Sequence, residues 1–174
     1  MKKLILSSII MLAISTGAFA QSFIDGNTLL NYLPFEIKGF TKHVTVDNQY
    51  KMDGTVDGTF AFISFEAADF EKSININLED RLNSDYLNTI KATYSEMSEY
   101  ESDGSYTKAI SFPDGTYGYV QINVSPSEKR SSSSIDVIIN NRFHLNIQIM
   151  GAANRELLDS IYESIEVAKL IGAN

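Results

Sequence analysis

Histidine is the side chain that most often carries acid–base or metal chemistry near neutral pH, and this chain has only His43 and His144. Both fall at polar positions of alternating segments, which predicts ordinary exposed side chains. A zinc centre needs three or four ligands, yet the sequence has no cysteine and no His-Glu-x-x-His spacing. A Gly-x-Ser-x-Gly elbow and phosphate-binding glycine loops are also absent. We therefore predict no metal, no cofactor and no catalytic residue.

Oxygen-bearing side chains alternate along Asp53–Gly58, where Asp53, Thr55 and Asp57 precede a glycine. This spacing matches the first half of a calcium loop, but position twelve is Ser64 where a bidentate Glu is required. Two Asp-Gly hairpin turns explain the same residues and are the favoured interpretation. Calcium binding by Asp53–Gly58 is left open.

Two further groups of side chains are candidates for a site. Glu66 and Asp69 flank the most apolar segment, which makes them the carboxylates to inspect for a raised pKa, although solvated strand ends are the more ordinary interpretation. Four tyrosines gather around one predicted helix and one predicted hairpin: Tyr94, Tyr106, Tyr117 and Tyr119. Such aromatics line grooves for proteins or apolar ligands, but they are more often buried in a core.

The first twenty residues have the pattern of a bacterial signal peptide. Lys2 and Lys3 precede an apolar run over residues 4–14, and Ala18-Phe19-Ala20 is a small-x-small cleavage signal. A run of about 11 residues is short for a membrane span, which needs about 20. We predict a signal peptide over 1–20 and a single domain over 21–174, exported to the periplasm or secreted. Because the signal is of bacterial type, the glycosylation sequon at residues 123–125 carries no weight.

The composition excludes several classes of partner. The whole chain has 14 basic and 22 acidic residues, and removing Lys2 and Lys3 leaves 12 and 22, a formal charge of −10. Such a surface repels nucleic acid and anionic lipid, although acidity also simply favours solubility. We therefore expect no nucleic-acid partner and no stable membrane insertion after signal removal; the oligomeric state is left open.

Hydrophobic periodicity predicts the order helix, three strands, helix, four strands, helix. The predicted strands cover residues 39–46, 59–67, 71–79, 106–112, 117–124, 134–139 and 142–150, and the helices cover 25–33, 84–98 and 154–170. Residues 47–58 and 99–105 are expected to be turns, and apolar positions on both faces of 59–67 predict a strand covered on both sides. Hairpin connections dominate. The class is α+β, a mainly antiparallel sheet of about seven strands covered by two amphipathic helices plus a short N-terminal helix.

The hairpin over residues 134–150 offers the surface that we expect to contact a partner. Asn140-Asn141 suits a tight primed turn, and the second strand alternates apolar with polar side chains. Residues 125–134, with four consecutive serines, are predicted to form a long mobile loop that carries positive charge on an acidic protein. The predicted partner surface joins this loop to the polar row of the strand: Lys129, Arg130, Arg142, His144, Asn146 and Gln148.

Two segments resemble the PsbP-like group of exported or lumenal proteins, which have an antiparallel sheet between helices. One is the hairpin Ala109-Ile110-Ser111-Phe112-Pro113-Asp114-Gly115-Thr116-Tyr117-Gly118, and the other is the strand and amphipathic helix over residues 143–170. The group's opening hairpin usually carries Tyr-Pro and Trp, which residues 35–46 lack. The resemblance implies a non-catalytic accessory or binding module and transfers no functional residue.

The sequence thus predicts an exported, non-catalytic binding or accessory protein that contacts another protein. Two alternatives remain open. A carboxylate-dependent hydrolase acting on glycans would place two carboxyl groups about 5–9.5 Å apart in a pocket. A carrier of an apolar small ligand would have a cavity of about 300–1,000 Å³.

Overall fold

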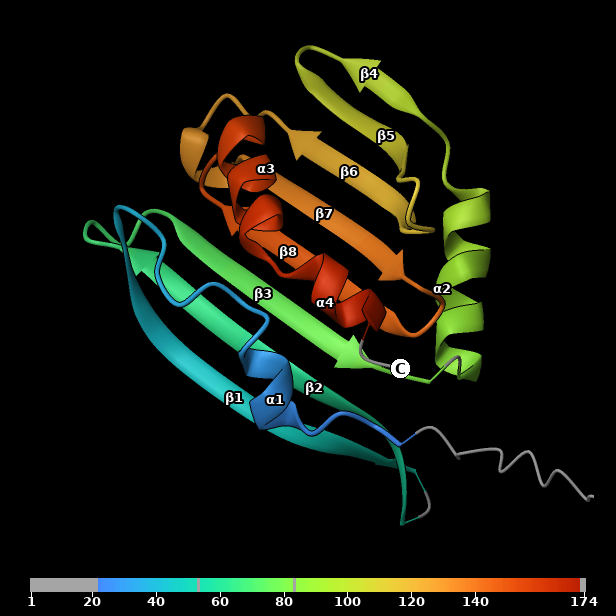
Figure 1. The fold of residues 1–174 in the computed structure, drawn as a ribbon. Helices are drawn as coiled ribbons and strands as arrows, with labels where there is room; N and C mark the ends of the chain where they lie inside the picture. The colour runs from blue at the N-terminus through green and yellow to red at the C-terminus, as the bar shows by residue number, and fades with distance from the viewer. Residues whose placement is uncertain (1–21, 53, 83, 173–174) are drawn as a thin grey trace, which may run out of the picture.

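The computed structural model describes residues 22–52, 54–82 and 84–172, and these form one antiparallel eight-stranded sheet with helices on its faces (Figure 1). The strand order across the sheet is β1-β2-β3-β8-β7-β6-β5-β4. The elements, in chain order, are α1 (Gly26–Leu30), β1 (Phe40–Met52), β2 (Thr55–Ala67), β3 (Ser73–Asp80), α2 (Asp85–Glu96), β4 (Tyr100–Ser102), β5 (Ser105–Ser111), β6 (Tyr117–Asn123), η1 (Glu128–Arg130), β7 (Ser132–Ile139), β8 (Phe143–Met150), α3 (Arg155–Ser164) and α4 (Val167–Gly172). The predicted α+β class is confirmed. The signal-peptide prediction for 1–20 falls outside the described residues.

The inner face of the sheet is the face that α1, α3 and α4 cover (Figure 1). It holds the main core, because the inward-facing residues of β3, β7 and β8 are buried and, apart from Asp80 and Ser133, apolar. Leu158 and Ile161 of α3 and Leu170 of α4 pack onto this face. Burial of such side chains at about 1.5–3 kcal/mol each fixes short helices whose intrinsic propensity could not stabilise them alone.

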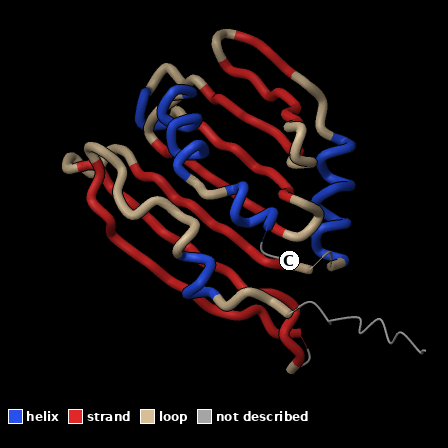
Figure 2. Tube along the Cα trace, viewed as in Figure 1, coloured by secondary structure: helices blue, strands red, loops and turns tan. Residues whose placement is uncertain are grey.

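The outer face of the sheet is the opposite face, and among the helices of the described residues only α2 packs on it. Leu87 and Tyr94 of α2 form a small second cluster with Tyr119 of β6 and Ile138 of β7. Away from α2 this face stays open, with half-exposed Asn75 and Asn77 and exposed Gln148. Figure 2 shows α2 standing at one end of the strands, apart from the helices of the inner face. The outer face is therefore the surface on which a binding site can be built.

The predicted primed turn at Asn140-Asn141 is confirmed, and side-chain caps begin two of the helices. Asn140 and Asn141 have φ of 50° and 51°, as the primed turn requires. Asp25 caps α1 by accepting from Thr28 N, and Asn154 caps α3 by accepting from Leu157 N. These residues fix where the elements begin.

The prediction that residues 47–58 form turns holds at Gly54, a turn residue with φ of 81°, and is wrong for most of the stretch. β1 continues to Met52 and β2 begins at Thr55, so Asp57-Gly58 lies inside a strand. A Cβ on Gly58 would lie 2.9 Å from the carbonyl oxygen of Asp80, which shows that this glycine permits close approach of β3 and is not a turn residue. β1 is an edge strand, and an edge strand can remain polar because its outer flank faces water.

Three other boundaries also differ from the predictions. Residues 99–105 contain β4, a short strand that the polar composition concealed. The single predicted helix over 154–170 is two helices, because Ile165 is extended and Glu166 N donates to Tyr32 O. The strand over 59–67 is not covered along both faces as expected, since Phe60 and Phe62 are half-exposed on the outer face.

The predicted mobile loop over 125–134 is shorter than expected. Residues 132–134 already belong to β7, and the buried Ser133 hydroxyl donates to Ala152 O and accepts from Asn154 N. Ser131 is also buried and its hydroxyl accepts from Ser125 N. The serines are therefore structural hydrogen-bonding residues that join β7 to the start of α3.

Candidate functional site

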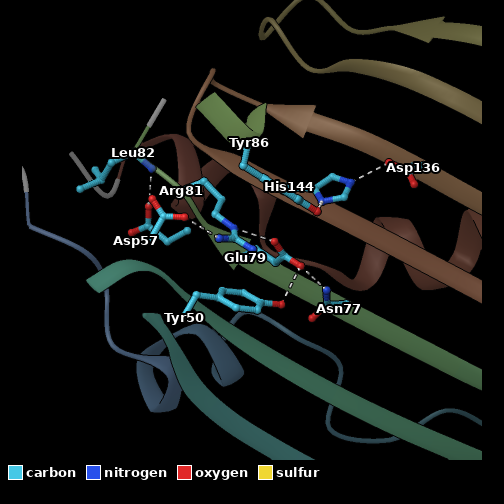
Figure 3. Close-up of polar contacts among 10 residues, drawn as sticks. Tyr50, Asp57, Asn77, Glu79, Arg81, Leu82, Tyr86, Asp136 and His144 are labelled. Carbon is cyan, nitrogen blue, oxygen red and sulfur yellow. Dashed lines mark hydrogen bonds and ion pairs between the residues drawn. The ribbon is translucent and has the colours of Figure 1, made fainter. Parts of the chain in front are cut away.

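A buried polar cluster on the outer face is built around Arg81, which follows β3 directly and is 6 % exposed. Its guanidinium carbon lies 3.8 Å from the ring centroid of Tyr50 and 4.1 Å from that of Tyr86, so the cation is stacked between two aromatic rings (Figure 3). Arg81 Nε donates to Glu79 Oε2 at 2.8 Å, and Nη1 lies 3.4 Å from Asp57 Oδ2. A buried charge is thus neutralised from two sides.

Glu79 completes this half of the cluster. It lies on the outer face of β3, opposite His144 of β8. Its Oε1 accepts from Asn77 Nδ2 at 2.7 Å and from Tyr50 Oη at 3.1 Å (Figure 3). Together with the bond from Arg81, three donors hold a carboxylate that is 3 % exposed.

The second half is a hydrogen-bonded chain through His144, which is 6 % exposed. His144 Nε2 lies 2.7 Å from Asp136 Oδ1, and Nδ1 lies 3.2 Å from Tyr86 Oη (Figure 3). An ionised carboxylate only accepts, so Nε2 carries the proton toward Asp136. In the neutral ring Nδ1 then accepts from the Tyr86 hydroxyl. Tyr86 joins the two halves, because the same ring stacks on Arg81.

Asp136 is the anionic centre of this chain. Its Oδ1 also accepts a short hydrogen bond from Tyr94 Oη, and its Oδ2 accepts from Asn146 Nδ2 at 2.9 Å. Burial acts to raise the pKa of Asp136, but the hydrogen bonds from His144, Tyr94 and Asn146, together with the positive charge of the His144 ring when it is protonated, act more strongly. The net result is a pKa below the ordinary value, so this carboxylate is ionised at neutral pH.

The tyrosines of the cluster hold their protons. Burial, with the nearby charge of Glu79, raises the pKa of Tyr86 to about 12. Burial and the contact with Asp136 raise the pKa of Tyr94 still further. A phenol with a raised pKa is a hydrogen-bond donor and not an activated nucleophile. The phenol–imidazole–carboxylate chain therefore resembles a proton relay in connectivity, but its resting state suits holding groups in place.

Beside this cluster lies an open groove of about 350 Å³ between α2 and the β5–β6 hairpin. Its aromatic wall comes from Tyr94 of α2 and from Tyr117 and Tyr119 of β6. The rings of Tyr94 and Tyr117 meet edge to face at 6.3 Å, and the Tyr119 hydroxyl lies 2.7 Å from Tyr94 O. The remaining lining residues are Lys91, Ser95, Ala109, Ile110, Ser111 and Gly118. Tyr94 contacts both the groove and Asp136, so the two features form one continuous site.

The predicted gathering of four tyrosines is confirmed for three. Tyr106 pairs with Ile122 and packs against the inner-face core, so it lies on the other side of the sheet. The reason is strand alternation: Tyr106 and Tyr117 belong to paired strands but to opposite faces.

The predicted partner surface is divided by the structure. His144 and Arg142 were expected to be exposed, and this prediction is wrong, because they are 6 % and 5 % exposed. Arg142 donates from Nε and Nη2 to the two oxygens of Asp80, at 2.9 and 2.6 Å, and from Nη2 to Ser22 O. His144 lies beneath Tyr86 of α2, an element whose position over β8 no local pattern shows.

The other residues of that surface remain accessible to different degrees. Gln148, Lys129 and Arg130 are exposed, and half-buried Asn146 is bound to Asp136. Lys129 Nζ lies 2.5 Å from Glu71 Oε1, so part of the loop's positive charge is already paired. Whether these residues contact a partner stays a prediction.

The earlier candidates for acid–base or metal chemistry do not converge on this site. His43 is exposed, as predicted, and lies 3.9 Å from Glu66, while Asp69 accepts from Glu71 N in an exposed turn. Residues 55–58 lie in β2, so they lack a calcium loop's backbone, and Asp53 is outside the described residues. Within ranges 22–52, 54–82 and 84–172, no group of three or more His, Asp or Glu is placed to hold a metal, and no helix is long and apolar enough to cross a membrane.

The contacts of Arg81 with Glu79 and Tyr86 were not predicted from the sequence. One signal was present: a charged run, Glu79-Asp80-Arg81, interrupts the alternation at the end of a strand between Leu78 and Leu82. Charges at that position are ordinary unless another element covers them, and α2 does so here.

Comparison with known proteins gives no further assignment. No family model matches the chain, and no curated protein and no solved structure matches it either. The function is therefore argued from the geometry of the outer face.

Proposed function

We propose that this is a non-catalytic binding protein that contacts another protein through the groove between α2 and the β5–β6 hairpin. The observation that carries the proposal is the groove itself, an open hollow of about 350 Å³ walled by Tyr94, Tyr117 and Tyr119. Tyrosine supplies large contact area with few rotatable bonds, and it is enriched where proteins bind one another. The neighbouring polar cluster fixes Tyr94 from behind, through Asp136.

The same cluster argues against the hydrolase alternative. A glycan hydrolase needs one carboxyl group that is protonated near neutral pH and another that is free to attack or to activate water. The pKa of Asp136 lies below its ordinary range. Burial raises this pKa, but the hydrogen bonds and the charge of the protonated His144 ring lower it by more. Glu79 is held by three donors and is 3 % exposed. Neither carboxylate is disposed for that chemistry.

The partner that suits this groove is a protein segment that inserts an apolar or aromatic side chain. Ala109 provides an apolar part of the floor, while the tyrosine rings give stacking surfaces. Lys91 places one cation at the groove on a chain of formal charge −8. Export by a signal peptide, and kinship to PsbP-like accessory proteins, agree with such a role and are part of the proposal.

Site-specific photo-crosslinking tests this proposal in living cells. Ser95 lines the groove and is exposed, whereas Glu163 is exposed on α3, on the inner side of the sheet. A photoreactive phenylalanine analogue at 95 is expected to capture one discrete protein, and the same analogue at 163 is not. Tyr117→Ala should abolish the capture, and with the purified partner it should weaken binding by about tenfold or more.

Two results would count against a protein-binding groove. One is equal capture from positions 95 and 163, because it would show that the groove has no preference. The other is full affinity of Tyr117→Ala for the captured protein. Charge reversal of Lys129 and Arg130 is a separate test of the loop surface, and retained binding in that variant would remove the loop from the interface.

A second candidate function, a carrier of an apolar small molecule, is favoured by the groove's size. About 350 Å³ lies at the lower end of the roughly 300–1,000 Å³ typical of small-molecule sites. Native mass spectrometry of the purified protein distinguishes this function. A bound small molecule that is present in the wild type and lost in Tyr117→Ala would favour the carrier over the protein-binding domain.

A further inference from the structure

The two edges of the sheet differ greatly in length. β4, at one edge, has three residues, whereas β1, at the other, has thirteen and, within the part of the chain that the structure describes, pairs only with β2 (Figures 1 and 2). A long edge strand presents a row of unpaired backbone N–H and C=O groups, which is a template for another strand. The β1 edge is therefore the place where this fold can be extended.

The side chains in the middle of β1 do not protect that edge, although Lys42 and Lys51 flank this stretch. Residues 41–49 are all exposed, and the stretch from His43 to Tyr50 contains neither lysine nor proline, the residues that usually block edge pairing. Val44 and Val46 lie on the outer face and are 37 % and 41 % exposed. Exposed valines on a long unpaired strand gain free energy when a second strand covers them.

The backbone geometry shows which groups point outward. The register between β1 and β2 is continuous from Val44 to Tyr50, with irregularities only between Lys42 and Val44 and between Tyr50 and Lys51. Gln49 N donates to Asn48 Oδ1, so this N–H is turned away from β2. Antiparallel strands alternate the direction of their backbone groups, so Thr45 and Asp47 also point outward.

We propose that the β1 edge binds the β1 edge of a second copy of this chain, antiparallel and centred on Thr45. In this register the two Thr45 residues exchange backbone hydrogen bonds across a two-fold axis. Val44 of each copy lies opposite Val46 of the other on the outer face. The two sheets join into one, by an isologous contact that uses the same surface twice.

Side-chain complementarity selects this register over its neighbours. Centring the pair on Val46 would place the two Val46 residues opposite each other but each Val44 opposite Asn48, so one apolar pair would replace two. Centring it on Asp47 would place two like charges directly opposite, which is destabilising. The irregularity at Lys42 and Val44 ends the ladder, so the contact is small and the dimer is weak, at the low end of specific interfaces.

The first test measures the mass of the full chain in solution at increasing concentration, by sedimentation or light scattering. The wild type is expected to shift from monomer to dimer. Thr45→Pro removes an outward N–H and leaves the pairing with β2 intact, so it should stay monomeric with unchanged circular dichroism. Thr45→Val keeps the N–H and should dimerise like the wild type.

The second test reads the register. Val44→Lys and Val46→Glu should each weaken dimerisation by about tenfold or more. The double variant should recover it, because the introduced lysine of each copy would face the introduced glutamate of the other. If the pair were centred on Val46, the two introduced glutamates would face each other and the double variant would be weaker than either single variant.

A third test uses the absence of cysteine from the sequence. Thr45→Cys should form a disulfide-linked dimer on mild oxidation, because paired residues of antiparallel strands lie within disulfide reach. Gln49→Cys is the matched control, exposed on the same edge but far from its counterpart across the two-fold axis. A wild type that stays monomeric at every concentration, or equal crosslinking from positions 45 and 49, would overturn the proposal.

Discussion

Two neighbouring carboxylates at the end of β3 each hold a buried arginine, but on opposite faces of the sheet. Asp80 faces the inner side and binds Arg142 through both of its oxygens, at 2.9 and 2.6 Å. Glu79 faces the outer side and makes one bond, at 2.8 Å, to Arg81. The inner pair is therefore a closed bidentate contact, whereas the outer pair is one part of a wider cluster.

The surroundings of the two arginines explain the difference. Arg142 also donates to Ser22 O, and Ile24 N donates to Asp80, so the inner pair ties the segment before α1 to the sheet. Arg81 is stacked between Tyr50 and Tyr86. The inner pair thus stabilises the fold directly, while the outer pair positions side chains around an open surface. Substitutions that separate these roles follow, from the largest effect to the smallest.

Asp80→Ala should cause the largest loss of stability. It leaves the Arg142 guanidinium buried without its carboxylate, and breaking a buried pair in this way costs about 3–5 kcal/mol. Urea denaturation monitored by circular dichroism measures the free energy of unfolding. Glu71→Ala is the control, because the pair of Glu71 with Lys129 is exposed to water and contributes little to stability. Equal losses of stability for the two variants would contradict the distinction between the buried pair and the exposed pair.

Glu79→Gln should cost less, about 1–3 kcal/mol, because it removes the charge and keeps the shape. Arg81 retains Asp57 at 3.4 Å and both tyrosine rings, so its cation is not left alone. The same denaturation experiment checks this value. A loss as large as that of Asp80→Ala would show that the outer cluster is as closed as the inner pair.

Asp136→Asn should lower the free energy of unfolding by about 1–2 kcal/mol. The Asp136 side chain is 37 % exposed, so water can satisfy some of the donors that now bond to the carboxylate. Its more specific effect is on Tyr94, which the carboxylate fixes beside the groove. We expect weaker binding of the partner that position 95 captures. Asp159→Asn, in the exposed pair with Arg155, is the matched control and should leave both stability and binding nearly unchanged.

The same contrast shows what the sequence can and cannot predict. Alternation in β3, β7 and β8 predicts the inner core, because each buried row depends only on the period of the local sequence. Asn140-Asn141 sets the turn and Asn154 caps the helix, and both depend on the local chemistry of asparagine. Local pattern also placed His144 in a polar row, correctly, but could not show that Tyr86 of α2 covers it. Burial of Arg142 likewise depends on Asp80, 62 residues away in sequence. Contacts set by tertiary packing, which make up most of the site, leave no periodic signal.

The smallest effect is a pH dependence that isolates Asp136. Burial opposes ionisation of this group, but its bonds from His144, Tyr94 and Asn146 lower its folded pKa below the ordinary 3.8. A lowered folded pKa means that the stabilisation is complete above about pH 4 and is lost as the pH falls through the folded value. The difference in unfolding free energy between wild type and Asp136→Asn should therefore be constant near neutral pH and shrink under acid conditions. A difference that instead grows as the pH falls would mean that the folded pKa is raised, and Asp136 could then serve as the proton donor that the binding proposal excludes.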